Sequence, residues 1–456
     1  MLVLRRTVTS LLFVGTIVAC SDDSRSDASS SSPTDESGIG DGDGDPTGDG
    51  DPTGDGDPGD GDPTGDGDPT GDGDPSGDDD PIKFDLSPIA DGSAQGCGGG
   101  MGNSPEFSYI YISNTAQGTL TKLNTQTMIE EGRYITRPDQ NGSPSRTSVS
   151  LSGDVAVANR NGGITKVYAR VEDCQDQNGT PGIQTSANKD NILPWGQEEC
   201  VAWYTAFPQY DSQRPVAWTA GDFNEGSCSF SNQKVWSSGR TANNVVEVVR
   251  LDGDTGALEA TVPIPGIDAG GFGAYGGVVD GEDGFWIMTY VSGFPLVHVS
   301  EDLTYEIHMA PQSLHPYGIT IDHNGRIWIA GDIGGTGRFD PETEQWDIIN
   351  GVTGLGIQEH PDGYMWMGTW PTLGIQAIDV ETMALGPNIP LPEAGGQSKG
   401  VSIDFYGYVW LVDMVSSAFR IDPDTLQYDI YNQLTQPYTY SDMTGWGLSN
   451  VSNPQG

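Results

Sequence analysis

Basic residues are scarce in this chain of 456 residues, which has 20 Lys and Arg against 65 Asp and Glu and a formal net charge of −45. So negative a surface repels phosphate backbones, which excludes nucleic acid as a partner. Hydrophobic residues make up only 35% of the chain, whereas there are 65 Gly and 30 Pro, which excludes a single helical domain. The sequence also lacks a P-loop, a nucleophile elbow, a Cys–His pair and an HExxH motif, so no catalytic class is indicated by motif.

Long apolar runs are absent except near the N-terminus. Arg5-Arg6 precede the apolar run 11–19, which is too short to span a bilayer as a helix and ends at Cys20. This pattern resembles a bacterial lipoprotein signal, which implies a membrane anchor through lipidated Cys20. Ser21 follows, where Asp would resemble an inner-membrane retention signal, so we expect an outer-membrane lipoprotein of the cell envelope, periplasmic or surface-exposed. An ordinary signal peptide and twin-arginine export through Arg5-Arg6 remain alternatives.

Cysteine is rare as well. Setting Cys20 aside leaves four thiols, which in an oxidising compartment indicate two disulfides with three possible pairings. We favour Cys174–Cys200, which closes one loop, together with Cys97–Cys228. The sequence leaves the other pairings open.

Residues 41–80 contain nothing but Asp, Gly, Pro, Thr and Ser. A segment without apolar side chains cannot offset its chain entropy, and its like charges extend it further. We therefore predict a signal peptide over 1–20 and a disordered acidic linker over 21–81. Calcium binding is the alternative, because Asp41 to Asp45 alternate with Gly, but Pro46 takes the position where a calcium loop needs Gly.

The second half of the chain repeats one unit. Residues 317–322 form a predicted strand, Asn324-Gly325 a tight turn and 326–330 the next strand. The same order recurs at Gly276–Ile307, Gly354–Leu385 and Gly400–Ile430. A tryptophan marks the second strand of each unit, at Trp286, Trp328, Trp366 and Trp410. Spacings of about 40 residues with four short strands per unit are typical of a β-propeller blade.

Two more blades are predicted in the first half, at Val149–Tyr168 and Val245–Val262. Tyr109–Ile112 reads as a second strand without a first, and Thr444–Ser449 as a first strand without a second. Pairing of these two would close the ring and leave no open sheet edge. We therefore predict an all-β, seven-bladed propeller over 82–456, closed by its terminal strands and carrying a Cys-bearing insertion at 174–228.

The repeat resembles that of virginiamycin B lyase (streptogramin lyase) propellers, which are NHL-like. The motifs that carry this resemblance are Pro316-Tyr317-Gly318-Ile319, Gly325-Arg326-Ile327-Trp328-Ile329 and Gly337-Arg338-Phe339-Asp340-Pro341. The resemblance implies an elimination enzyme that uses channel histidines, a glutamate and a divalent metal. The family's histidine position holds Tyr317 here, and of five histidines only His315 approaches the expected rim. His323 and His360 fall at the opposite turns, where we expect solvated side chains.

Ligands of propellers usually lie where the first strands converge on the channel. The residues expected at this mouth are Tyr275, Tyr317, Lys399 and Trp446 before first strands, and Tyr290 and Trp370 after second strands. Such an aromatic ring with polar groups suits the stacking of a sugar or another flat, polar ligand. The alternative is that these rings only plug the channel. Asp332, Asp413 and Asn159 are the candidate ligands for one divalent metal, Ca²⁺ or Mg²⁺.

The sequence therefore favours a recognition module that binds a glycan, peptide or protein at the channel mouth or along the insertion. The alternative is a metal-dependent lyase or lactone hydrolase of the streptogramin-lyase type with an altered site. A third reading is a passive surface protein whose channel is plugged.

Overall fold

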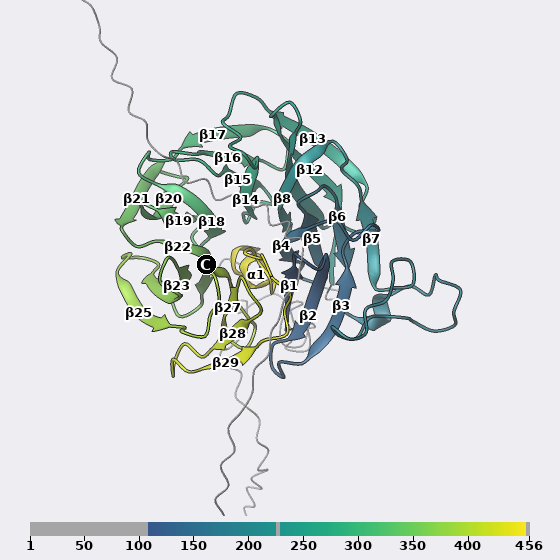
Figure 1. Cartoon of the computed structure of the whole chain (residues 1–456). Helices are drawn as coiled ribbons and strands as arrows, with labels where there is room; N and C mark the ends of the chain where they lie inside the picture. The colour runs from purple at the N-terminus through teal and green to yellow at the C-terminus, as the bar shows by residue number, and fades with distance from the viewer. Residues whose placement is uncertain (1–107, 225–228, 453–456) are drawn as a thin grey trace, which may run out of the picture. The chain divides into compact units, whose positions relative to one another are not determined.

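Short strands, most of them buried, are the main regular elements of residues 108–224 and 229–452, the part of the chain that the computed structural model describes. Within these residues seven antiparallel sheets form blades around a common centre, as predicted, and an additional two-stranded ribbon is present (Figure 1). Cys20, Cys97, Cys228 and the linker 21–81 lie outside the described residues. No helix in the described ranges is long and apolar enough to cross a membrane.

Each blade runs outward from the channel in chain order. The first sheet holds β1 (Tyr109–Asn114), β2 (Thr119–Asn124) and β3 (Glu130–Ile135). The second holds β4 (Pro144–Val149), β5 (Val155–Asn159), β6 (Ile164–Val167) and β7 (Val201–Thr205). The third holds β8 (Tyr210–Trp218), β11 (Lys234–Thr241), β12 (Val246–Asp252) and β13 (Leu258–Ile264). A small ribbon, β9 (Asp222–Asn224) with β10 (Ser229–Ser231), branches from this sheet's first connection.

The four remaining blades are the units in which the tryptophan repeat was recognised. They are β14 (Ala274–Val279), β15 (Phe285–Thr289), β16 (Pro295–Val299) and β17 (Tyr305–Met309); then β18 (His315–Ile321), β19 (Ile327–Ile333), β20 (Gly335–Asp340) and β21 (Gln345–Asn350). They continue with β22 (Gly354–His360), β23 (Tyr364–Thr369), β24 (Gly374–Asp379) and β25 (Leu385–Pro390), and end with β26 (Ser398–Ile403), β27 (Val409–Asp413), β28 (Ala418–Ile421) and β29 (Tyr428–Tyr431). The first strands β4, β8, β14, β18, β22 and β26 contact one another in sequence, and we call them the inner strands.

The chain ends close the ring, as predicted. Residues 438–443 run beside β1, where Tyr111 N–H donates to the Met443 carbonyl at 2.9 Å and Tyr438 N–H donates to the Ser113 carbonyl at 3.3 Å. This segment therefore takes the inner position that the three-stranded sheet lacks.

The prediction of a strand at Thr444–Ser449 was wrong, because the chain turns there and forms helix α1 (Trp446–Ser452). Gly445 adopts φ +89°, and the Asp442 carboxylate accepts hydrogen bonds from the N–H groups of Gly445 and Leu448, both at 3.0 Å. An acidic side chain that satisfies free N–H groups at a helix start favours the helix over an extended strand. Helix α1 lies at the centre of the ring (Figure 1). Its buried side chains Trp446, Leu448 and Val451 belong to the apolar cores of the blades.

A buried Asp–Trp hydrogen bond recurs in three blades. The indole N–H of the second-strand tryptophan donates to the carboxylate that follows the inner strand, in the pairs Trp286–Asp280 (3.0 Å), Trp328–Asp322 (2.9 Å) and Trp410–Asp404 (2.7 Å). In the blade β22–β25 the corresponding residue is His360, and Trp366 Nε1 has no hydrogen-bond partner in the described structure. His360 is only 2% exposed, so the expectation that it is solvated was wrong.

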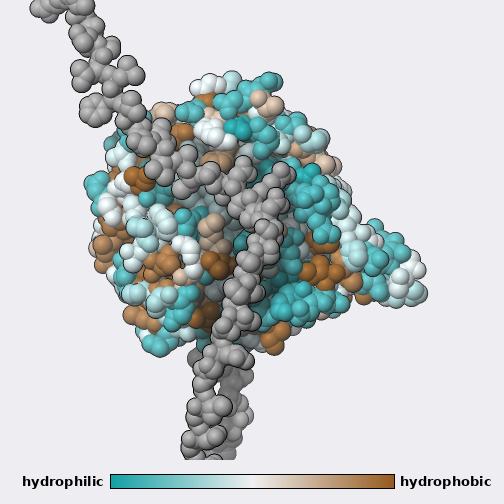
Figure 2. Space-filling model, viewed as in Figure 1, coloured by the Kyte–Doolittle hydropathy of each residue, from teal (hydrophilic) through white to brown (hydrophobic). Residues whose placement is uncertain are grey.

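The segment predicted as an insertion divides into a loop, two blade strands and the short strand β9. The disulfide Cys174–Cys200 is present as predicted and closes a loop that projects beside β7, with a mostly hydrophilic surface (Figures 1 and 2). The Glu199 carboxylate organises the loop by accepting three backbone hydrogen bonds. The rest of the predicted insertion contributes β7 and β8 to two blades.

Replacing Trp446 tests whether α1 stabilises the ring. The side chain is buried, packs against Phe405 and donates from its indole to the Glu359 carbonyl at 3.0 Å. We expect Trp446→Ala to lower the free energy of unfolding by about 3–5 kcal/mol, measured by urea denaturation. Val415→Ala, at a position that is 51% exposed, is the control and should change stability by less than about 0.5 kcal/mol. Equal unfolding midpoints for both variants would contradict this role.

Candidate functional site

The mouth of the channel, at the amino-terminal ends of the inner strands, is built by a repeated β-bulge. Tyr275, Tyr317 and Lys399 are each the extra residue at a register shift between the inner strand and its neighbour. A bulge bends the strand and redirects the side chain of the extra residue. The fold therefore directs these three predicted side chains into one place.

Seven aromatic side chains and one leucine form a packed group at the mouth, which we call the mouth cluster. Its buried members are Tyr275, Tyr317, Leu355 and Tyr440, and its half-buried members are Phe272, Tyr290, Trp370 and Tyr438. Ring centroids are 4.5 Å apart for Tyr275 and Tyr290, and 4.9 Å apart for Tyr317 and Tyr440. The half-buried rings are partly exposed to solvent, so they are the members of the cluster that a ligand could contact.

Three cations lie against these rings. The Arg146 guanidinium lies 2.9 Å from the Tyr440 ring centroid, Arg214 lies 5.0 Å from that of Tyr275, and the Lys399 ammonium lies 4.6 Å from that of Tyr317. All three are almost completely buried. Cation–π contacts stabilise each of these charges. In the described structure Nε and Nη1 of Arg146 and of Arg214 have no hydrogen-bond partner.

The hydroxyl groups of three tyrosines form one network at the mouth. Tyr317 donates to the Tyr438 oxygen at 2.8 Å, the Tyr275 oxygen lies 2.7 Å from it, and Lys399 donates to Tyr317. Burial raises the pKa of Tyr275 and of Tyr317. Burial acts in the same direction on Tyr438, but the charges of Lys399 and Arg214 and the two tyrosine hydrogen bonds outweigh it and lower its pKa to about 7.

A histidine–carboxylate pair stands at the rim of the mouth cluster. His315 Nδ1 lies 2.6 Å from Asp332 Oδ1, and the Tyr290 hydroxyl donates to Asp332 Oδ2 at 2.6 Å. The Tyr290 and His315 rings meet edge to face with centroids 4.3 Å apart. The carboxylate fixes the imidazole through Nδ1, an arrangement that would suit proton transfer at the other ring nitrogen.

The residues predicted to bind a metal do not fit such a site. Both Asp332 oxygens are bonded to His315 and Tyr290, and the Asp413 carboxylate accepts four backbone N–H groups. Asn159 exchanges hydrogen bonds with Thr136. In the described ranges no three His, Cys, Asp or Glu side chains are grouped to hold a metal ion. The hydrogen bonds of these three side chains stabilise nearby turns and strand ends instead.

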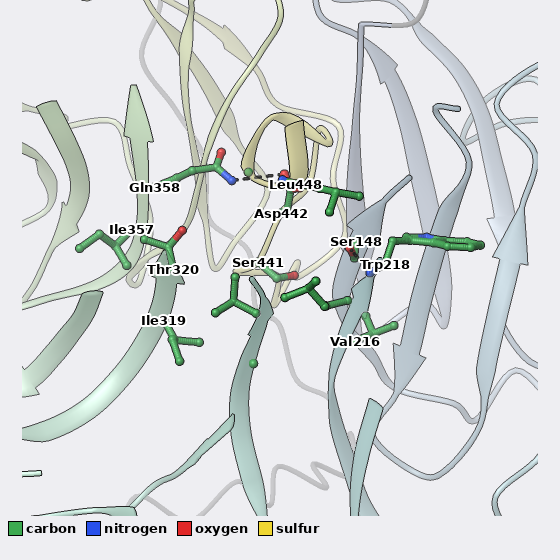
Figure 3. A pocket seen from close by; sticks show the side chains of 15 residues that line it. Ser148, Val216, Trp218, Ile319, Thr320, Ile357, Gln358, Ser441, Asp442 and Leu448 are labelled. Atoms are coloured by element: carbon green, nitrogen blue, oxygen red, sulfur yellow. Dashed lines mark hydrogen bonds between the residues drawn. The ribbon is translucent and has the colours of Figure 1, made fainter. Parts of the chain in front are cut away.

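Below the mouth the channel is filled. A cavity of about 30 Å³ remains between the inner strands and the C-terminal segment, large enough for about one or two water molecules. Val216, Ile319, Ile357 and Leu448 are among the apolar residues that line it, and Gln358 donates to Asp442 at 3.2 Å in its wall (Figure 3). A ligand at the mouth therefore cannot pass through the ring.

Five of the six predicted ligand-binding residues belong to this mouth: Tyr275, Tyr317, Lys399, Tyr290 and Trp370. Trp446 was wrongly placed there, because it lies on α1 and bonds to Glu359, near the carboxyl-terminal end of β22. The sequence analysis missed Tyr438, Tyr440, Arg146 and Arg214. The alternating aromatics of Tyr438-Thr439-Tyr440 would have indicated an inner-strand position. Aligning Ser145-Arg146 with Tyr275-Gly276 would have revealed an arginine where β14, β18 and β26 have glycine.

The fold and this mouth define the chain as a seven-bladed β-propeller with an aromatic and cationic site at one end of its channel. The sequence matches no protein-family model and no curated protein. Virginiamycin B lyase from Staphylococcus aureus is a structural neighbour, with 16% identity, a TM-score of 0.48 and coverage of 68% of this chain and 92% of that one.

Two other neighbours have different names. A candidate 6-phosphogluconolactonase from Bacteroides uniformis has 12% identity and a TM-score of 0.50, covering 73% of this chain and 98% of that one. The Cps50 (Swd1) propeller domain of Myceliophteria thermophila has 9% identity and a TM-score of 0.45, covering 63% and 86%. The candidate lactonase likeness supports the propeller fold, and these identities are too low to assign an activity.

The Tyr438 environment predicts one tyrosine that ionises near neutral pH. Absorbance at 295 nm, which reports phenolate, should rise with a midpoint near pH 7 for one residue, and Tyr438→Phe should remove this step. Lys399→Met should move the midpoint upward, because it removes a positive charge. Since the unfolded pKa of about 10 is higher, ionised Tyr438 favours the folded state, and the native protein should gain stability over Tyr438→Phe between pH 7 and 10. A first tyrosine midpoint near 10 would contradict the network.

Proposed function

We propose that this propeller is a recognition module that binds a glycan or peptide ligand at the channel mouth. The observation that carries the proposal is the half-buried aromatic edge of Phe272, Tyr290, Trp370 and Tyr438, placed over buried cations and hydroxyl groups. Aromatic faces supply contact area for a flat, polar ligand, and the polar groups behind them supply orientation.

A purely structural role as a channel plug explains the composition of the mouth less well than ligand binding does. Apolar side chains close the channel at the depth of the small cavity, so the ring does not need a second closure at the mouth. Polar and charged groups are costly to bury, and they are found where they have a partner or a function. The mouth combines both kinds of group, whereas the deeper plug is largely apolar.

Binding to a panel of glycans and peptides tests the proposal. We expect at least one class of ligand to bind the full chain. Tyr290→Ala and Trp370→Ala should each weaken binding by about tenfold, because each removes an aromatic contact that contributes about 1.5 kcal/mol to the binding free energy. Calorimetry or surface plasmon resonance provides the measurement. Trp195→Ala is the matched control, since this half-buried ring packs on Tyr204 in the Cys174–Cys200 loop.

The control also separates the two candidate surfaces. Binding lost in Trp195→Ala and retained in the mouth variants would move recognition to the loop and overturn the mouth proposal. Mass analysis of the recovered ligand distinguishes recognition from turnover. A cleaved ligand, with cleavage abolished in His315→Gln, would favour the bond-breaking alternative through the His315–Asp332 pair.

We further propose that the propeller is displayed from the cell envelope through lipidated Cys20. The support is the sequence alone: an apolar run that ends at this cysteine and is followed at once by a polar, acidic segment. A disordered arm would give the recognition site reach. Labelled palmitate should be incorporated by the native chain and not by Cys20→Ala, which should also leave the membrane fraction. Labelling that persists in Cys20→Ala would contradict lipidation at Cys20.

A further inference from the structure

Two arginines at the mouth are buried, and some of their N–H donors have no hydrogen-bond acceptor among the described residues. Arg146 is 1% exposed and Arg214 is 6% exposed. Nε and Nη1 of each guanidinium have no hydrogen-bond partner in the described part of the chain. Arg146 donates one side-chain hydrogen bond within the described structure, from Nη2 to the Tyr275 carbonyl at 2.5 Å.

The surroundings of these arginines supply no carboxylate. In the described structure neither Arg146 nor Arg214 forms an ion pair, and each instead lies over tyrosine or phenylalanine rings. Burial lowers the pKa of Arg146, and the charge of Arg214 lowers it further. A buried charge is costly unless it is paired, so this pair of guanidinium groups is incomplete without an anion.

The contrast with the rest of the molecule strengthens this reading. The chain has 65 acidic residues, and surface arginines such as Arg338 and Arg420 bind carboxylates of their own blades. The one place where buried guanidinium groups lack a carboxylate, among the described residues, is the aromatic mouth. An anion supplied from outside would complete their hydrogen bonds.

We propose that the mouth recognises its ligand through an anionic group, a carboxylate or a sulfate, that binds to Arg146 and Arg214. The proposal rests on the recognition function proposed above and names the ligand class as an acidic sugar. The sugar ring would stack on the half-buried aromatic edge, and its acidic group would accept hydrogen bonds from the guanidinium donors.

Tyr438 would act as the gate to this position. Its half-buried ring lies over Lys399 at 4.1 Å and over Arg160 at 5.1 Å, and its oxygen is bonded to Tyr317 and Tyr275. Residues 432–445 around it form no helix or strand, so the side chain is carried by irregular backbone. In the proposed complex we expect this ring to move when the ligand reaches the arginines.

The same charges would serve both Tyr438 and the ligand. Lys399 and Arg214 favour ionised Tyr438, and a bound anion would neutralise part of that positive field. Anion binding should therefore raise the pKa of Tyr438. The groups that face Tyr438 are Tyr275, Tyr317, Lys399, Arg160, Arg214 and Tyr440, none of which is a carboxylate.

The test uses the full chain with three probes: galacturonate oligosaccharide, a sulfated galactose oligosaccharide and the uncharged galactose oligosaccharide. Calorimetry measures binding, and absorbance at 295 nm measures the Tyr438 midpoint with and without each probe. We expect at least one acidic probe to bind at least about tenfold more tightly than the neutral one and to raise the midpoint by about one pH unit.

Variants assign the effect to the arginines. Arg146→Met and Arg214→Met should each weaken binding of the acidic probe by at least about tenfold, and Arg214→Lys, which keeps the charge, should lose less. Arg170→Met is the control, because this arginine lies on the surface with a side chain that is 46% exposed. If Arg146→Met does not fold, the Arg214 pair of variants decides the question.

The outcomes separate this inference from the proposed function. Preference for the galacturonate probe assigns a carboxylate, and preference for the sulfated probe assigns a sulfate. Equal affinity for acidic and neutral probes, with loss in Tyr290→Ala, would overturn the anionic class and leave recognition standing. Binding of no probe and no change in the Tyr438 midpoint would overturn the inference, while another ligand from the panel could still support recognition. Equal loss in Arg170→Met and the mouth variants would refute the assignment to Arg146 and Arg214.

Discussion

The backbone hydrogen bonds between residues 438–443 and β1 are the constraint on which the rest of the structure depends. Without them the first sheet would present the open edge of β1 to the channel, and an unpaired edge is a template for association. The same segment carries Tyr438 and Tyr440 into the mouth and leads into α1 at the other end. One continuous segment therefore closes the ring, contributes two tyrosines to the site and supplies part of the plug.

The Arg146 guanidinium lies at the mouth because the blade β4–β7 departs from the glycine pattern of β14, β18 and β26. Inner strands approach so closely that a Cβ on Gly318 would collide with the Leu355 carbonyl, and a Cβ on Gly356 would lie 2.5 Å from the Lys399 carbonyl. Glycine at these positions lets neighbouring inner strands pack closely. At the corresponding position β4 has Arg146, whose guanidinium lies over the Tyr440 ring. With glycine at this position, the mouth would lack the Arg146 guanidinium and keep the buried charges of Lys399 and Arg214.

The blades were predictable because each turn and tryptophan is a local signal repeated at a fixed spacing. Tyr275, Tyr317 and Lys399 could be placed at the mouth for the same reason, since each precedes the glycine of an inner strand. The fate of Trp446 was not predictable, because it depends on Asp442 and Gly445, which redirect the chain after the ring has closed. Arg146 and Tyr438 are far apart in sequence and come together only through that closure, so no local pattern links them.

The Asp–Trp hydrogen bond also differentiates the blades from one another. Where Asp280, Asp322 or Asp404 receives the indole N–H, the second strand is tied to the turn that follows the inner strand. In β22–β25 that tie is missing, and a buried donor on Trp366 is left unmet. Cooperative units of a protein open locally in order of their own stability. Amide hydrogens of this blade should therefore exchange with solvent before those of the three tied blades, which gives a nominally symmetric ring a preferred place to start unfolding.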